Sequence, residues 1–167
     1  MGRFVPFVAS LGFLLLINAN PLDKRAALDT CLTTTGVPVF TTGTSDYTQA
    51  LKPFNLRVTF KPAAYAVPQT IKQVQDAVSC GAANGVQVTA KSGGHSYASH
   101  GLGGEDGHLI VDMRNFKDVV VDQTAKTAVI GTGGRLGDVA TALYKQGKQA
   151  IAHGTCPGCV LSSNLSL

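Results

Sequence analysis

The spacing of apolar residues predicts regular elements from residue 64 onward. Residues 64–67 form a short apolar run that stops at Pro68, which is typical of a strand. Thr70 can cap a following helix, because a threonine side chain accepts a hydrogen bond from a first-turn amide. Gly85 stands where a left-handed residue favours the end of that helix. The helix is expected to collect its apolar residues on one face, namely Ile71, Val74, Val78 and Ala82.

Glycine-rich turns separate the elements that follow. Further strands are expected at residues 86–90, 109–111, 119–121, 128–130 and 150–152, with the third and fourth forming a hairpin. A second helix is expected after Gly134, with one face made by Leu136, Val139, Ala140, Leu143 and Tyr144. Residues 26–62 predict an extended leading segment with a short helix near Leu28. This order of elements predicts a mixed α+β fold.

The two ends of the chain do not follow this pattern. Arg3, the apolar stretch from residue 4 to 17 and the small residue Ala19 predict a secretory signal peptide over residues 1–19. The apolar stretch is shorter than the roughly 20 residues that a membrane-spanning helix needs. Residues 159–167 are rich in Ser and Leu, contain no glycine and predict an irregular tail. We therefore expect a secreted, extracellular protein whose folded part covers residues 20–158.

Charge and cysteine content narrow the class of protein. The formal net charge of +4 is modest, and the basic residues are scattered, so a nucleic-acid partner is not indicated. The four cysteines are Cys31, Cys80, Cys156 and Cys159. Export would place them in an oxidising compartment, where four cysteines allow three pairings. Spacing alone does not choose among these pairings.

The turn at residues 91–96 is the first candidate for chemistry. Two adjacent glycines after a strand can aim successive backbone N–H groups at a bound anion, especially a phosphate. His95 lies in the same turn, where an imidazole can serve as a base, a metal ligand or a covalent attachment point. It can equally well fill an ordinary hydrogen-bonding role in the loop.

Two other segments offer weaker signals. Residues 131–137 place glycines between a strand and a helix, but Leu136 stands where a Gly-x-Gly-x-x-Gly dinucleotide motif needs its third glycine. Cys156 and Cys159 form a Cys-x-x-Cys pair. A thioredoxin-like redox site would have to open a helix, and a zinc site with His153 lacks a second properly spaced ligand pair.

Three motifs in fixed order carry a resemblance to a known family. Residues 91–99, 131–137 and 153–158 closely resemble corresponding segments of the berberine-bridge-enzyme-like, FAD-linked oxidases, the fungal glucooligosaccharide oxidases among them. The resemblance covers roughly residues 28–158. It implies the N-terminal part of a vanillyl-alcohol-oxidase-type (PCMH-type) FAD-binding domain. A similarly placed pair in the family implies a disulfide between Cys31 and Cys80.

The resemblance also implies specific contacts with FAD. The pyrophosphate would lie on the turn from Ser92 to Ser96, His95 would bond the flavin 8-methyl carbon, and the Cys156 sulfur would bond carbon 6 of the ring. The full set of cofactor-binding residues expected in this way is Ser92, Gly93, Gly94, His95, Ser96, Gly133, Gly137, Thr155, Cys156 and Gly158. No metal site is expected.

The family oxidises the anomeric carbon of a sugar by hydride transfer to the flavin, and dioxygen then reoxidises the flavin to give hydrogen peroxide. The implied partners are therefore a small-molecule substrate, an oligosaccharide, and dioxygen, with no nucleic acid and no membrane. After Gly158 the family continues into a glycine-rich segment, whereas this chain continues with Cys159. The tyrosine base and the substrate domain of the family have no counterpart here. We therefore expect a truncated, inactive fragment of such a carbohydrate oxidase, without a catalytic residue. Two alternatives remain open: an FAD-linked oxidase of secondary metabolism, and a secreted, cofactor-free binding protein on the same fold.

Overall fold

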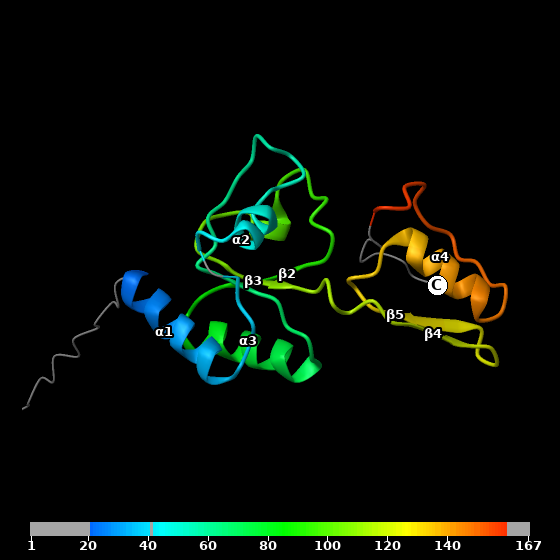
Figure 1. Ribbon diagram of the computed structural model, residues 1–167, viewed down its shortest axis with the longest axis horizontal. Coiled ribbons are helices and arrows are strands. Elements are labelled where there is room, and N and C mark those ends of the chain that lie inside the picture. The colour runs from blue at the N-terminus through cyan, green and yellow to red at the C-terminus, as the bar shows by residue number, and fades with distance from the viewer. Residues whose placement is uncertain (1–20, 41, 160–167) are drawn as a thin grey trace, which may run out of the picture.

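The computed structural model describes residues 21–40 and 42–159. The predicted signal peptide and residues 160–167 of the predicted tail lie outside this part of the chain. Figure 1 shows two groups of elements side by side, one around a parallel sheet and one around a hairpin. Among the described residues, no helix is both long enough and apolar enough to cross a membrane.

The first group is a three-stranded parallel sheet covered on both faces. Its strands β1 (Ala64–Ala66), β2 (Val88–Lys91) and β3 (Leu109–Asp112) lie in the order β1-β3-β2. The helices α1 (Pro21–Thr34) and α3 (Ile71–Ala83) lie on one side, and α2 (Ser45–Ala50) lies on the other (Figure 1).

The alternation of side chains along the strands separates two cores. Leu109 and Val111 pack toward the helices α1 and α3, with Leu28 and Leu32 of α1 in the same cluster. Ile110, between them in sequence, packs on the opposite face with residues of α2 and of the short 3-10 helix η1 (His100–Leu102). Successive strand residues point to opposite faces, so a fully apolar strand requires cover on both sides.

Helix α3 begins and ends as predicted but buries a different face. The Thr70 side chain accepts a hydrogen bond from Gln73 N at 3.2 Å, and Gly85 has the left-handed φ of 61°. Of the predicted apolar face only Val74 packs against the core, whereas Ile71 and Val78 are 63% and 47% exposed, so most of that prediction is wrong. The buried residues are Ala77, Cys80 and Gly81. A Cβ at position 81 would lie 2.2 Å from Val88 Cγ2, so close approach of α3 to β2 requires a glycine there.

The predicted disulfide is confirmed. Cys31 of α1 and Cys80 of α3 are bonded, with their Cα atoms 5.7 Å apart. Helix α1 has 14 residues and is therefore much longer than the short helix expected near Leu28. Helix α2 falls within the segment that we expected to be extended.

The second group contains the predicted hairpin and a helix packed on it. Strands β4 (Val119–Asp122) and β5 (Thr127–Ile130) are antiparallel, and α4 (Leu136–Lys145) packs against β4. Leu136, Val139 and Leu143 are buried as expected, but Tyr144 is 63% exposed, so its predicted place on the core face is wrong.

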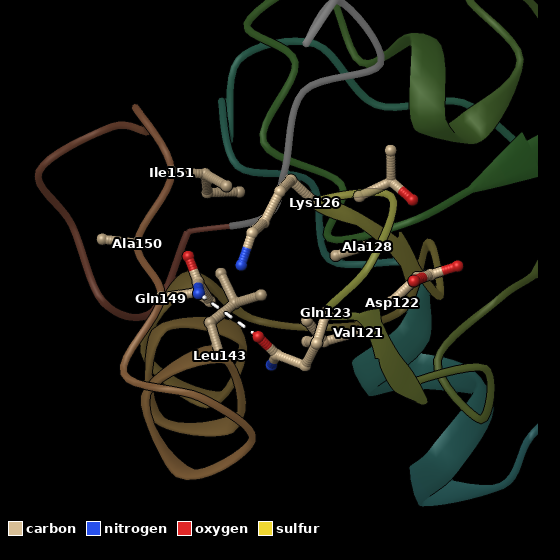
Figure 2. A pocket seen from close by; sticks show the side chains of 10 residues that line it. Val121, Asp122, Gln123, Lys126, Ala128, Leu143, Gln149, Ala150 and Ile151 are labelled. Carbon is tan, nitrogen blue, oxygen red and sulfur yellow. Dashed lines mark hydrogen bonds between the residues drawn. The ribbon is translucent and has the colours of Figure 1, made fainter.

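The strand expected at residues 150–152 is also wrong. This segment runs without regular structure beside the hairpin and lines a small cavity of about 50 Å³ with Leu143 and residues of β4 and β5. Figure 2 shows this cavity and the hydrogen bond from Gln149 Nε2 to Gln123 Oε1, which is 3.3 Å long. The Gln146 side chain pairs instead with the backbone of β4, accepting from Val121 N at 3.2 Å and donating to Val119 O at 2.7 Å. The cavity has room for one or two water molecules, not for a ring-sized ligand.

Candidate functional site

The turn from Ser92 to Ser96 leaves the carboxyl end of β2 with a row of free amides. The residues of the turn are half-buried, and Gly94 has the left-handed φ of 70°. None of the four backbone N–H groups from Gly93 to Ser96 donates a hydrogen bond to another described residue. Partly buried amides need acceptors, and successive amides in such a turn fit an anion such as a phosphate.

The Lys91 ammonium group lies directly beneath this turn. Lys91 is buried, and its Nζ donates a hydrogen bond to the Ala50 carbonyl oxygen at 2.6 Å. A Cβ at Gly94 would lie 2.7 Å from Lys91 Cε, so the turn rests on the lysine side chain. Burial lowers the pKa of Lys91, and the nearby Asp112 carboxylate opposes this effect. The lysine adds positive charge on the inner side of the turn.

Asp112 anchors a buried polar network at the same end of the sheet. The Tyr65 hydroxyl donates to Asp112 Oδ2 at 2.5 Å, and Arg114 Nη2 donates to the same oxygen at 2.7 Å. Burial favours the neutral carboxyl, but the hydrogen bonds from Arg114 and Tyr65 outweigh burial and lower the pKa of Asp112. Burial and the Asp112 charge raise the pKa of Tyr65 far above its usual range.

Sequence reasoning missed this network. Tyr65 lies in the apolar run predicted as a strand over residues 64–67, and the strand predicted at residues 109–111 stops before Asp112. The available signal was a charged residue at the carboxyl end of each of two strands, Lys91 in β2 and Asp112 in β3. Parallel strands bring their carboxyl ends to one edge, where ligand sites in α/β sheets concentrate.

His95 faces an open groove with its ring nitrogens free. Its ring stacks on Phe54 with centroids 4.8 Å apart, and Tyr97 contacts Phe54 edge-on at 5.3 Å. Neither His95 nitrogen bonds to a described residue. The groove, about 380 Å³ in volume, is lined by Gln49, Lys52, Pro53, Phe54, Leu56, Gly93, Gly94 and His95.

The other histidines near this turn are placed differently. His108 is buried and makes hydrogen bonds with Thr89 Oγ1 at 2.8 Å and Glu105 Oε1 at 3.0 Å. His100 is exposed at the start of η1. His95 is therefore the histidine that combines free ring nitrogens with a place beside the free amides.

The second glycine turn, at residues 131–134, is hydrogen-bonded to the first, but its own glycine amides are already paired within the protein. The Ser92 hydroxyl donates to the Thr132 carbonyl oxygen. The N–H groups of Gly131, Gly133 and Gly134 all bond to backbone carbonyls. A Cβ at Gly133 would lie 2.1 Å from Met113 O, so this glycine permits close backbone packing. The predicted contact of Gly133 with the cofactor stays a prediction.

The third motif folds over the amino end of α4. Gly137 N donates to Pro157 O, and Leu136 N donates to Cys159 O, both at 2.9 Å. Thr155, Cys156 and Gly158 are exposed and make no hydrogen bond with the turn at residues 92–96. Within residues 21–40 and 42–159, no group of three or more His, Cys, Asp or Glu side chains could hold a metal ion.

Residues 62–166 match the family described as FAD binding domain. The chain belongs to this family. The match confirms the predicted α+β FAD-binding domain of PCMH type. The row of free amides over Lys91 fits the doubly charged pyrophosphate of FAD, whereas the small cavity beside the hairpin does not fit any part of the cofactor as large as a ring.

Curated relatives of this FAD-binding domain include several fungal oxidases. The chain is 45% identical to xylooligosaccharide oxidase of Thermothelomyces thermophilus over 93% of its own length and 31% of the relative. It is 50% identical to chitooligosaccharide oxidase of Gibberella zeae, over 84% of this chain and 28% of the relative. It is also 50% identical to FAD-linked oxidoreductase dpmaF of Metarhizium anisopliae, over 85% of this chain and 28% of the relative.

A solved structure of glucooligosaccharide oxidase from Acremonium strictum, described for its 6-S-cysteinyl, 8α-N1-histidyl FAD, has a similar fold. It superimposes with a TM-score of 0.76 at 40% identity, over 80% of this chain and 28% of the oxidase. The chain thus spans less than a third of the length of the relatives that it matches.

Proposed function

We propose that the protein is the flavin-binding part of a secreted oxidase that acts on an oligosaccharide. The observation that carries the proposal is the row of free amides from Gly93 to Ser96 beside His95, whose ring nitrogens make no hydrogen bond to a described residue, within an FAD-binding domain. The names of the oligosaccharide oxidases among its relatives support the substrate class. The proposed secretion rests on the signal-like residues 1–19.

The residues of the turn would bind and orient the cofactor. The amides from Gly93 to Ser96 would donate to the pyrophosphate oxygens, and the Lys91 ammonium beneath them would add electrostatic attraction. Ser92 would hold the turn in place through its bond to Thr132. When bound, FAD supplies the acceptor for the sugar's hydride and passes the electrons to dioxygen, which yields hydrogen peroxide.

His95 and Cys156 would attach the flavin covalently. Phe54 stacks on the His95 ring and limits its orientations, while both ring nitrogens stay free to react. Cys156 is an exposed free thiol. The histidyl and cysteinyl linkages described for the related glucooligosaccharide oxidase support this assignment. The cofactor-binding set would be completed by two pairs of residues. One pair is Thr155 and Gly158, beside Cys156, and the other is Gly133 and Gly137, which pack the two turns.

A second candidate is an FAD-linked oxidase of secondary metabolism. The relative dpmaF is named only as an FAD-linked oxidoreductase, yet it is as similar to this chain as the chitooligosaccharide oxidase is. Cofactor binding would be the same in both cases. Peroxide assays with cello-, xylo- and chito-oligosaccharides on the longer parent protein would separate the two, since only a carbohydrate oxidase responds to them.

By itself, the 167-residue chain should not turn over substrate. Hydride transfer from an alcohol needs a base within hydrogen-bond reach of the hydroxyl proton. Tyr97 and Tyr144 are 73% and 63% exposed, without a hydrogen-bond partner among the described residues to activate their hydroxyls. Tyr65 is buried, and its hydroxyl donates a hydrogen bond to Asp112. None of these tyrosines is placed to serve as the base.

Denaturation of flavin-loaded protein tests the proposal directly. Residues 20–167, and in parallel the longer parent, would be incubated with FAD, precipitated in acid and inspected for flavin absorbance in the pellet. His95→Ala should abolish the histidyl flavopeptide, whereas His100→Ala, a matched change at an exposed histidine, should leave it intact. Flavin lost from the wild-type parent, or a histidyl linkage located at His100 or His108, would contradict the assignment.

A further inference from the structure

The two cysteines of the third motif face each other across a tight turn. Cys159 N donates a hydrogen bond to Cys156 O at 3.1 Å, which closes a four-residue turn through Pro157 and Gly158. Such a turn brings its first and last Cα atoms within about 7 Å. A disulfide needs Cα atoms roughly 4.4–6.8 Å apart, so the turn holds the cysteines at bonding range.

Helix α4 holds this turn in place without any help from the cysteine side chains. Its first amides, Leu136 N and Gly137 N, donate to Cys159 O and Pro157 O, and Arg135 Nη1 donates to Gly158 O at 3.3 Å. Three bonds therefore constrain the backbone on both sides of Gly158. A turn that is already ordered loses little entropy when its ends are linked, which favours ring closure.

The two thiols differ in reactivity. Cys156 is exposed and Cys159 is half-buried, and neither belongs to the Cys31–Cys80 disulfide. A hydrogen bond from Cys159 lowers the pKa of Cys156, and the amides of Gly158 and Cys159 lower it further. The same bond to Cys156 raises the pKa of Cys159. Because the thiolate is the nucleophile in exchange reactions, Cys156 is the thiol that should react first.

We propose that Cys156 and Cys159 form a reversible dithiol–disulfide pair that exchanges with small disulfides such as oxidised glutathione. The Cys156 thiolate attacks one glutathione sulfur, forms a mixed disulfide and releases the first glutathione thiolate. Cys159, after losing its proton to water, attacks the Cys156 sulfur and releases the second. The two protein thiols are oxidised, one small disulfide is reduced to two thiols, and the two protons end on glutathione.

The pair has a consequence for flavin attachment, which rests on the proposed function above. A Cys156 sulfur bonded to Cys159 is not available to carbon 6 of the flavin, so oxidation of the pair would block the cysteinyl linkage but leave the histidyl linkage untouched. The redox pair itself requires no flavin and is tested without it.

Mass spectrometry of the full chain, free of flavin, tests the pair. The protein is equilibrated at a series of reduced-to-oxidised glutathione ratios, quenched in acid and alkylated, and the tryptic peptide 149–167 is weighed. In the wild type, a fraction of this peptide should carry no alkyl group and be two hydrogen atoms lighter than the reduced, unalkylated peptide. That fraction should rise with oxidised glutathione and fall again when reduced glutathione is restored.

Single substitutions supply the matched controls. Cys159→Ser should stop at one glutathione on Cys156, and Cys156→Ser should acquire glutathione on Cys159 several-fold more slowly. A wild-type peptide that carries two glutathiones, or that keeps two alkylated thiols at every ratio, would overturn the proposal. If the disulfide forms but the histidyl and cysteinyl flavopeptides are both missing from loaded protein, the pair stands and the proposed flavin attachment fails.

Discussion

Tyr65 and Asp112, on the adjacent strands β1 and β3, are joined by a hydrogen bond of 2.5 Å between the hydroxyl and Oδ2. Both side chains are almost fully buried. The bond therefore helps to keep a charged carboxylate inside the domain, beside Lys91, with which Asp112 is paired in the β2–β3 register.

Tyr65→Phe should destabilise the domain and make it more sensitive to acid. The change removes one of the donors to a buried carboxylate, which should cost about 1–3 kcal/mol of the free energy of unfolding in urea. Since the pKa of Asp112 is lowered in the folded state, its stabilisation is present above the unfolded pKa and is lost as pH falls through the folded pKa. Without Tyr65, this loss should begin at a higher pH.

The exposed Tyr144 supplies the control for that experiment. Tyr144→Phe should leave both the urea midpoint and the acid transition where they are in the wild type. If Tyr65→Phe and Tyr144→Phe had the same urea midpoint and the same acid transition, the Tyr65–Asp112 hydrogen bond would contribute nothing to stability.

Removal of the Cys31–Cys80 bridge should cost more than any single hydrogen bond. The cysteines are 49 residues apart, and a closed loop of this size contributes up to about 4 kcal/mol by restricting the unfolded chain. The double variant Cys31→Ala, Cys80→Ala should lower the thermal midpoint, whereas Cys156→Ser, Cys159→Ser should not. A bridge-free protein as stable as the wild type would show that the α1–α3 packing suffices.

Gly133→Ala should be strongly destabilising, and Gly158→Ala should be close to neutral. A Cβ at Gly133 would meet the Met113 carbonyl oxygen at 2.1 Å, so the backbone would have to move, at a cost of roughly 1–3 kcal/mol. A Cβ at Gly158 would meet nothing within 4 Å. Urea unfolding of the two variants measures the difference, and similar values for both would argue against this account of the second glycine turn.

Lys91→Met should weaken the binding of FAD while preserving the support that the side chain gives to the turn. Methionine keeps most of the aliphatic length beneath Gly94 but removes the charge, and we expect the dissociation constant to rise by roughly tenfold, or ~1.4 kcal/mol. Calorimetric titration with FAD at two salt concentrations should show a smaller salt dependence in the variant.

A matched lysine and a change of pH sharpen this test. Lys72→Met, on the exposed surface of α3, should leave the dissociation constant unchanged. Because the pKa of Lys91 is lowered, its side chain should lose its charge at a less alkaline pH than an ordinary lysine does. Wild-type affinity for FAD should therefore begin to fall at that less alkaline pH. Wild-type affinity with no such dependence, together with normal binding by Lys91→Met, would remove Lys91 from the site.

The elements that sequence reasoning predicted correctly depend on contacts within a few residues. The Thr70 cap acts on an amide three positions away, Gly85 meets a local need for positive φ, and the hairpin pairs Val119 with Ile130 across a short turn. The turn at residues 91–96 was visible for the same reason, since adjacent glycines after a strand determine its backbone locally.

Only the tertiary structure decided which surfaces are buried and which charges meet. Helix α3 turns its small residues inward because the sheet approaches closely at Gly81, and Tyr144 is exposed because no other described element covers that side of α4. Parallel pairing of the strands aligns their carboxyl ends, and only this alignment brings together the side chains of Lys91, Tyr65, Asp112 and Arg114. Burial and electrostatics of this kind depend on partners far away in sequence, whereas caps and turns are determined by near neighbours.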